Sequence, residues 1–82
     1  MRILYFAWLK SKTGTGEEIL DAPEAETVRD LIALLRRRGA GHAEALADLN
    51  CIRVAVNQDF AEFDQRLSPG DEVAFFPPVT GG

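Results

Sequence analysis

The chain has 82 residues, of which 46% are hydrophobic and 27% are charged, and its formal net charge is −4. This length allows one domain, and no apolar run approaches the roughly 20 residues of a membrane span. The acidic balance argues against nucleic-acid binding, which needs a basic face. The single cysteine, Cys51, excludes an internal disulfide and a cysteine-based metal cluster, and we expect no metal site. The apolar run at residues 3–9 lacks the small-residue cleavage site of a signal peptide, so we expect a cytoplasmic domain.

Two strands and a loop are predicted before the first long helix. Residues 2–9 are rich in aromatic and β-branched side chains, which favour a strand. The polar residues 10–16 include two glycines and indicate a hairpin loop, and residues 17–22 form a shorter predicted strand. Thr27 is then expected to be a helix N-cap, with Asp30 completing a variant of the capping box.

An amphipathic helix is predicted after Thr27, because apolar residues recur at the spacing i, i+3, i+4 and i+7. These residues are Val28, Leu31, Ile32 and Leu35. We expect Gly39 to cap the helix, and the arginines at 36–38 to complement its dipole rather than to bind phosphate. A second short helix is predicted over residues 42–49, with Leu46 and Leu49 facing inward.

Three strands are predicted in the C-terminal part, at residues 51–57, 60–63 and 72–76. Residues 68–71, Ser-Pro-Gly-Asp, fit a type II turn before the last strand. Helical residues thus separate two groups of strands, which predicts an α+β fold with one main helix packed across one face of a sheet. The first and last strands are the most apolar, so we expect them at the sheet centre, with some parallel pairing.

Strand alternation assigns the side chains to two faces of the predicted sheet. The expected core partners beneath the helix are Ile3, Tyr5, Val54, Val56, Val73 and Phe75. The residues expected on the opposite side are Leu4, Phe6, Trp8, Phe60 and Phe76. These aromatic side chains form either an exposed binding surface or a minor second core that the loops close.

The last six residues are predicted to form an extended tail, so that residues 1–76 are the body and residues 77–82 the tail. Pro77 and Pro78 favour an extended path and lack the N–H groups that would continue a sheet. Gly81 and Gly82 carry no Cβ, so a partner's narrow channel could close on their backbone. The only chemical handle of this end is the α-carboxylate of Gly82. The alternative interpretation is a frayed terminus without a role.

Other side chains with reactive groups have simpler interpretations. Cys51 could carry sulfur as a persulfide, but its place at the start of a predicted strand favours an inert core thiol. His42 is the only histidine and is expected to be a surface residue. Asp71 and Glu72 could suggest an acid–base pair, but adjacent strand residues point to opposite faces, which favours turn and surface roles.

The C-terminal residues closely resemble a known signature. Residues 67–82 read Leu-Ser-Pro-Gly-Asp-Glu-Val-Ala-Phe-Phe-Pro-Pro-Val-Thr-Gly-Gly, and they resemble the end of the small, sulfur-carrier subunits of molybdopterin synthase. Residues 4–7 (Leu-Tyr-Phe-Ala) and 54–58 (Val-Ala-Val-Asn-Gln) are similar to that family too. The resemblance implies a ubiquitin-like β-grasp fold with a mixed sheet of about five strands.

The resemblance also implies a chemistry centred on Gly82. An activating enzyme would use ATP to adenylate the Gly82 carboxylate, and a persulfide donor would convert it to a thiocarboxylate. The tail would then enter the large synthase subunit, where the sulfur attacks a cyclic pyranopterin precursor and two rounds build the dithiolene of molybdopterin. The chain would hold no permanent cofactor and would be no enzyme on its own, since the catalytic side chains belong to the large subunit. The implied assembly is a heterotetramer of two small and two large subunits.

The partner contacts expected from this resemblance are Phe6, Phe60, Phe76 and Trp8 on the body. Pro77, Pro78, Val79, Thr80 and Gly81 are the expected channel contacts of the tail. Two alternatives stay open. One is a related Gly-Gly carrier that serves thiamine synthesis or tRNA thiolation, or a modifier that is conjugated to lysines. The other is a β-grasp interaction module with a chemically idle tail.

Overall fold

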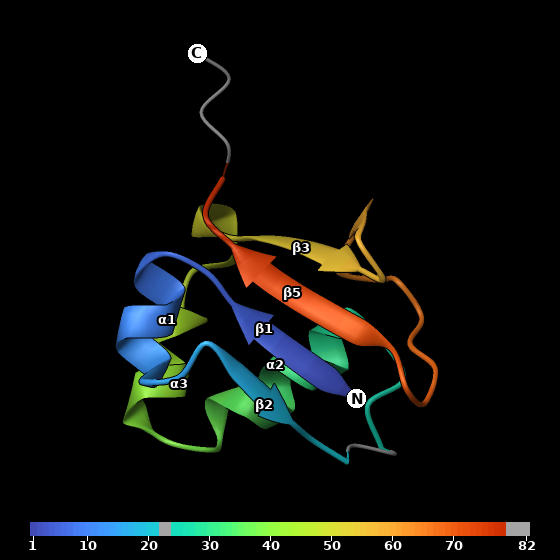
Figure 1. Cartoon of the computed structure of the whole chain (residues 1–82), viewed down its shortest axis with the longest axis horizontal. Helices are drawn as coiled ribbons and strands as arrows, with labels where there is room; N and C mark the ends of the chain where they lie inside the picture. The colour runs from blue at the N-terminus through green and yellow to red at the C-terminus, as the bar shows by residue number, and fades with distance from the viewer. Residues whose placement is uncertain (22–23, 79–82) are drawn as a thin grey trace.

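A computed structural model of the chain describes residues 1–21 and 24–78. Five strands form one sheet, and three α-helices lie on one side of it and at one end (Figure 1). In chain order the elements are β1 (Arg2–Tyr5), α1 (Trp8–Thr13), β2 (Glu17–Ile19), α2 (Val28–Arg36), α3 (Ala40–Ala45), the 3₁₀ helix η1 (Leu49–Cys51), β3 (Arg53–Val56), β4 (Asp59–Ala61) and β5 (Glu72–Phe76).

The sheet is mixed, with the strand order β2-β1-β5-β3-β4. The first and last strands of the chain, β1 and β5, are neighbours and run parallel, and all other pairs are antiparallel. This parallel pair requires a crossover, which α2 provides. The predicted α+β architecture with central first and last strands is therefore confirmed.

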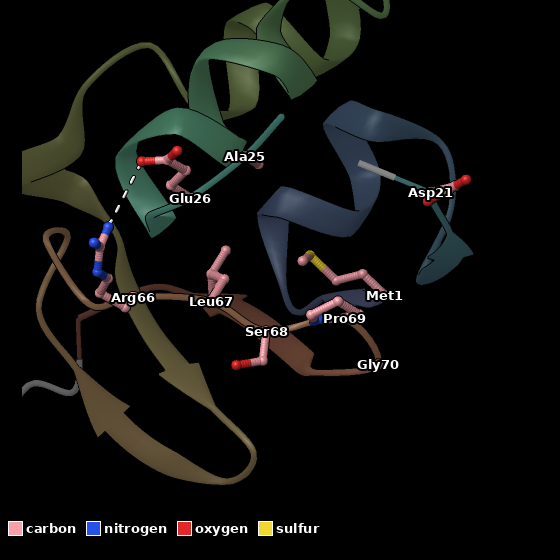
Figure 2. Close-up of a pocket in the computed structure, with 9 residues that line it drawn as sticks. All are labelled: Met1, Asp21, Ala25, Glu26, Arg66, Leu67, Ser68, Pro69 and Gly70. Carbon is pink, nitrogen blue, oxygen red and sulfur yellow. Dashed lines mark ion pairs between the residues drawn. The ribbon is translucent and has the colours of Figure 1, made fainter. Parts of the chain in front are cut away.

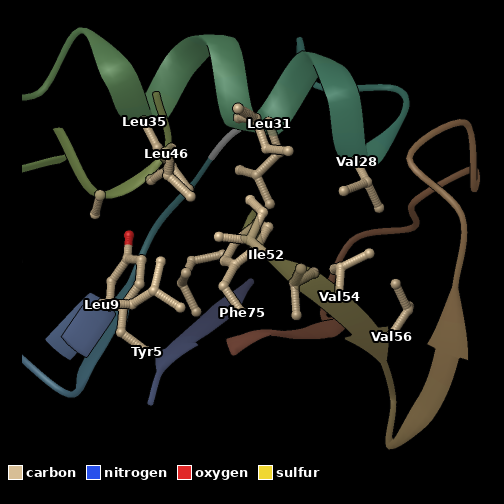
Figure 3. Packing of buried hydrophobic residues seen from close by; sticks show 14 of the residues in the cluster. Tyr5, Leu9, Val28, Leu31, Leu35, Leu46, Ile52, Val54, Val56 and Phe75 are labelled. Carbon is tan, nitrogen blue, oxygen red and sulfur yellow. The ribbon is translucent and has the colours of Figure 1, made fainter. Parts of the chain in front are cut away.

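Helix α2 begins and packs as its residue pattern predicts. The Thr27 hydroxyl accepts a hydrogen bond from the backbone N–H of Asp30 at 3.2 Å, and the Asp30 carboxylate accepts one from the N–H of Thr27 at 3.2 Å. This capping box satisfies helix donors that would otherwise lack partners. The apolar stripe of α2 then lies on the sheet, with Leu31 and Leu35 pointing into the core (Figure 3).

The core lies between α2 and the sheet, and strand alternation together with helical spacing correctly predicted ten of its members. Each large apolar side chain buried there contributes about 1.5–3 kcal/mol to folding. The predicted residues are all buried: Ile3, Tyr5, Val28, Leu31, Ile32, Leu35, Val54, Val56, Val73 and Phe75.

The N-terminal strand is shorter than predicted, because the chain turns sharply after Tyr5. Ala7 has a φ of 56° and a ψ of −133°, a backbone conformation that residues other than glycine rarely adopt, and this conformation ends the strand. The next residues form helix α1, so the prediction of a strand and a loop at residues 8–13 was wrong. Gly14 ends α1 in the left-handed conformation with a φ of 83°.

Other boundaries also differ from the predictions, among them those of β2, β3 and β4, which are predicted at residues 17–22, 51–57 and 60–63. Arg37, not Gly39, is the C-cap of α2, and Gly39 is instead the N-cap of α3. Helix α3 ends at Ala45, before the predicted end at Leu49, although Leu46 is buried and Leu49 packs against the core as expected. The predicted turn at residues 68–71 is confirmed, since Gly70 has a φ of 87° and the N–H of Asp71 donates to the Ser68 carbonyl.

None of the helices in the described ranges is both long enough and apolar enough to cross a membrane.

Candidate functional site: the open sheet face and the base of the tail

One face of the sheet carries α2, and we call the other the open face. The residues of the open face follow from strand alternation, because the residues next to them in β1, β3 and β5 point into the core. At its middle lie the partly exposed Leu4, Ala55 and Ala74, which are register neighbours across β1, β5 and β3. The full set on this face is Arg2, Leu4, Glu17, Ile19, Arg53, Ala55, Phe60, Glu72, Ala74 and Phe76.

An aromatic pair occupies the corner of the open face next to the tail. Phe60 on β4 and Phe76 at the end of β5 have ring centroids 5.8 Å apart. Phe60 is 80% exposed, and Phe6, directly after β1, is 49% exposed. Large apolar side chains gathered at this level of exposure are typical of a binding surface. The exposure of Phe60 favours that interpretation over a minor second core.

Trp8 does not lie on a strand, so its predicted place on the open face was wrong. The strand ends at Tyr5, so alternation does not extend to Trp8, which is the first residue of α1 and is 37% exposed. The structure therefore brings Phe60 and Phe76 together, places Phe6 at the end of β1, and puts Trp8 on a helix.

The tail begins at the end of a central strand. β5 ends at Phe76, and the chain continues through the half-buried Pro77 and Pro78 (Figure 1). Because both prolines lack an N–H group, neither can extend the ladder between β3 and β5. The predicted tail contacts Val79, Thr80 and Gly81 and the predicted sulfur site Gly82 lie outside the described residues.

Cys51 is exposed, so the prediction that its thiol lies in the core was wrong. The residue ends η1, and β3 begins only at Arg53. Its sulfur lies 3.3 Å from a carboxylate oxygen of Asp48, and this hydrogen bond and the negative charge raise the pKa of the Cys51 thiol. Since the thiolate is the reactive form, Asp48 makes Cys51 less nucleophilic at neutral pH.

A polar cluster on the helix side of the sheet was not predicted. Glu18 accepts a hydrogen bond of 2.7 Å from the Tyr5 hydroxyl, and its carboxylate also lies 2.7 Å from His42 Nε2 and 3.2 Å from Arg38 Nε. The His42 side chain is only 14% exposed, so the expectation of a surface histidine was wrong. Burial alone would raise the pKa of Glu18, but the bonds from His42 and Tyr5, with the charges of His42 and Arg38, lower it overall. Burial and the bond to Glu18 raise the pKa of Tyr5.

The turn residues Asp71 and Glu72 have the structural roles that were expected of them. The Asp71 carboxylate accepts hydrogen bonds from the Asn57 amide at 3.0 Å and from the Ser68 N–H at 2.8 Å. The Glu72 carboxylate lies 3.2 Å from Arg2 Nη1. Among residues 1–21 and 24–78 no group of three or more His, Cys, Asp or Glu side chains is arranged to hold a metal ion.

A cavity of about 380 Å³ opens at the other end of the sheet (Figure 2). Met1, Leu67 and Pro69 supply apolar walls, and an ion pair of 3.6 Å joins Arg66 to Glu26 at its edge. The cavity lies beside Gly70, before β5 begins, whereas the tail leaves after β5 ends. It is therefore separate from the base of the tail.

The chain matches the model of the ThiS family over residues 3–82. It is 43% identical to the molybdopterin synthase sulfur carrier subunit of Escherichia coli, over 100% of this chain and 99% of that protein. A putative molybdopterin converting factor, subunit 1, from Pyrococcus furiosus has a TM-score of 0.79 and 32% identity, with 95% of each chain covered.

Two further solved structures are similar. Small archaeal modifier protein 1 from Haloferax volcanii has a TM-score of 0.75 and 28% identity, over 96% of this chain and 97% of that one. A chain in the complex of subunits 1 and 2 of molybdopterin-converting factor from Helicobacter pylori has a TM-score of 0.66 and 23% identity, over 99% and 96%. The five-stranded mixed sheet and these likenesses confirm the predicted β-grasp fold. The chain belongs to the ThiS family, and along its whole length it is similar to the sulfur carrier subunits of molybdopterin synthase.

Proposed function

We propose that this chain carries sulfur on the carboxylate of Gly82 and delivers it for the synthesis of molybdopterin. The observation that carries the proposal is that the family match runs from residue 3 to residue 82 and so includes the Gly-Gly end. The relative with 43% identity is a molybdopterin synthase sulfur carrier subunit, and 99% of its length is covered.

The chemistry proposed for Gly82 proceeds in two activating steps. A partner enzyme transfers AMP from ATP to the carboxylate, with release of pyrophosphate, and so makes the acyl carbon a good electrophile. The outer sulfur of a protein persulfide then attacks this carbon and AMP leaves. A thiol that cleaves the resulting acyl disulfide releases the thiocarboxylate. Its sulfur is anionic at neutral pH and is a strong nucleophile.

Delivery of the sulfur is proposed to depend on docking of the body. The partner is the large synthase subunit, as in the Helicobacter pylori complex of subunits 1 and 2. The aromatic corner formed by Phe60 and Phe76, with Phe6 nearby, supplies an apolar contact directly beside the start of the tail. Once the body is bound, entry of the tail into the active site is effectively intramolecular, which raises its local concentration.

A reconstituted reaction tests this function. The thiocarboxylated chain is mixed with the large subunit and the cyclic pyranopterin precursor, and molybdopterin is measured. We expect product with the wild-type chain. Gly81→Ala adds a Cβ where the partner's channel closes on the backbone, and we expect a loss of about 100-fold. Gly39→Ala is the matched control, because an added Cβ there meets nothing within 4 Å.

The outcomes of this reaction separate the alternatives. No product from the wild-type chain, despite a loaded thiocarboxylate, would contradict the molybdopterin assignment and favour another Gly-Gly carrier. Normal product from Gly81→Ala would contradict the narrow channel. Conjugation of the chain to lysines would favour a modifier, the role that the name of the Haloferax volcanii small archaeal modifier protein gives it.

A further inference from the structure

Three charged residues form a cluster at the end of the open face that lies away from the aromatic pair. Arg2 on β1 lies between Glu17 on β2 and Glu72 on β5. Its Nε lies 2.6 Å from Oε2 of Glu17, its Nη2 lies 3.4 Å from Oε1 of Glu17, and its Nη1 lies 3.2 Å from Oε1 of Glu72. We call Arg2, Glu17 and Glu72 the charged cluster.

The charged cluster has one carboxylate more than it has cations. One guanidinium faces two carboxylates, so its formal charge is +1 − 2 = −1. The Arg2, Glu17 and Glu72 side chains are 50%, 46% and 24% exposed. A carboxylate can accept about four hydrogen bonds, so both glutamates have room for a further donor. At this exposure the ion pairs contribute little to folding stability, so stability does not explain them.

A partner that docks on the aromatic pair reaches the charged cluster. Glu72 and Phe76 are the two ends of β5, and four steps of about 3.3 Å separate them by about 13 Å. An interface of ordinary size buries about 800 Å² on each side, which corresponds to a disc with a radius of about 16 Å. On β5 only Ala74 lies on the open face between Glu72 and Phe76, and its small side chain leaves no barrier to a flat partner surface. Its register neighbours on that face are the apolar Leu4 and Ala55.

Electrostatics then restricts the kind of partner. A surface without a cation would cover an uncompensated negative charge, which costs free energy, whereas Lys or Arg would satisfy the free acceptor sites. Resting on the proposed function, we propose that the charged cluster determines partner specificity by facing a cationic side chain of the docked protein. The partner surface thus combines an apolar socket for Phe60 and Phe76 with a lysine or arginine about 13 Å away.

A pair of double variants tests this proposal against the net charge. Glu17→Gln with Glu72→Gln removes two carboxylates from the charged cluster. Glu44→Gln with Asp64→Asn is the matched control, since it also removes two exposed carboxylates that form ion pairs. Glu44 pairs with Lys12 on α1, and Asp64 pairs with Arg29 on α2. Both double variants change the formal net charge from −4 to −2. Thermal unfolding of the two double variants is measured to check that both are folded to the same extent.

Association with the large synthase subunit is measured at low salt and at about 1 M salt, where the Debye length is about 3 Å. We expect the cluster variant to bind about tenfold more weakly at low salt, chiefly through a slower association rate, and like wild type at 1 M salt. The control stays within about twofold of wild type at both. Equal binding of the two double variants, or tighter binding by the cluster variant, overturns the proposal.

Phe60→Ala separates this proposal from the function on which it rests. If wild type binds and Phe60→Ala weakens binding, while the cluster variant behaves like the control, only the role of the charged cluster is wrong. If the wild-type chain does not bind the large subunit, the proposed function fails and the cluster proposal fails with it.

Discussion

Gly41 is the residue at which a single added carbon has the clearest structural cost. A Cβ at this position in α3 would overlap the carbonyl oxygen of Lys12 in α1. The backbone of one helix thus rests directly on that of the other, and only glycine allows this approach. We expect Gly41→Ala to lower the free energy of unfolding by about 1–3 kcal/mol, as overpacking does in other cores.

Chemical denaturation checks the prediction, and Gly39→Ala is again its control. Gly39 has an extended backbone with a φ of 165°, and a Cβ there meets nothing within 4 Å. A loss of stability in Gly39→Ala equal to that in Gly41→Ala would show that the contact with Lys12 is not responsible, because alanine is the better helix former and helix propensity alone would favour both variants.

At the residue scale, sequence patterns predicted side chains whose neighbours are local and missed those whose neighbours are distant. The partners Thr27 and Asp30 are three residues apart and were predicted. The environment of His42 depends on Glu18, which is 24 residues away and comes into contact with it only through the fold. No local signal marks such a pair.

At the scale of elements, Glu18 joins four segments through side chains. Tyr5 reaches it from β1, His42 from α3, and Arg38 from the segment after α2, while Glu18 itself is in β2. Its pKa is lowered in the folded chain, so the carboxylate contributes stability above its unfolded value of 4.5. This contribution is lost as the pH falls through the lower folded value.

Unfolding measured as a function of pH tests this role in wild type and in Glu18→Gln. The variant is expected to be about 1–3 kcal/mol less stable at neutral pH, because part-buried donors lose a charged acceptor. The difference should shrink as the pH falls below 4.5, where the carboxylate is protonated first in the unfolded chain and then, at its lower pKa, in the folded chain. Glu44 is an exposed carboxylate paired with Lys12, so the stability difference between wild type and Glu44→Gln should change little with pH. A difference that grows on acidification would contradict the account.

Helix α2 was the most predictable element and α1 the least, for physical reasons. α2 has an apolar stripe with helical spacing and a capping box, so local and tertiary preferences agree. The residues around α1 include an aromatic run that favours a strand, and the helix depends on the unusual backbone of Ala7 and on packing against α3. Both the Ala7 backbone and the packing against α3 depend on the tertiary fold, so the secondary-structure propensities of the residues do not indicate them.

At the scale of the whole molecule, the sheet separates two tasks. Its covered face holds the core that stabilises the domain, and its open face carries the apolar corner and the charged cluster. The pairing of β3 with both β5 and β4 brings Phe60 to Phe76 at the end of β5, so the tail starts at that corner. Alternation along the strands predicted this division, whereas the pairing of Arg2 with Glu17 and Glu72 depends on register between strands far apart in sequence.

The location of the transferred sulfur decides whether Gly82 is the sulfur-carrying residue. Wild type and Cys51→Ser are incubated with an activating enzyme, ATP and a persulfide donor, and intact mass and fragmentation are recorded. We expect both proteins to exchange one oxygen for one sulfur, in the fragment that contains Gly82. An unchanged mass, or sulfur on Cys51 that is absent from Cys51→Ser, would contradict this expectation.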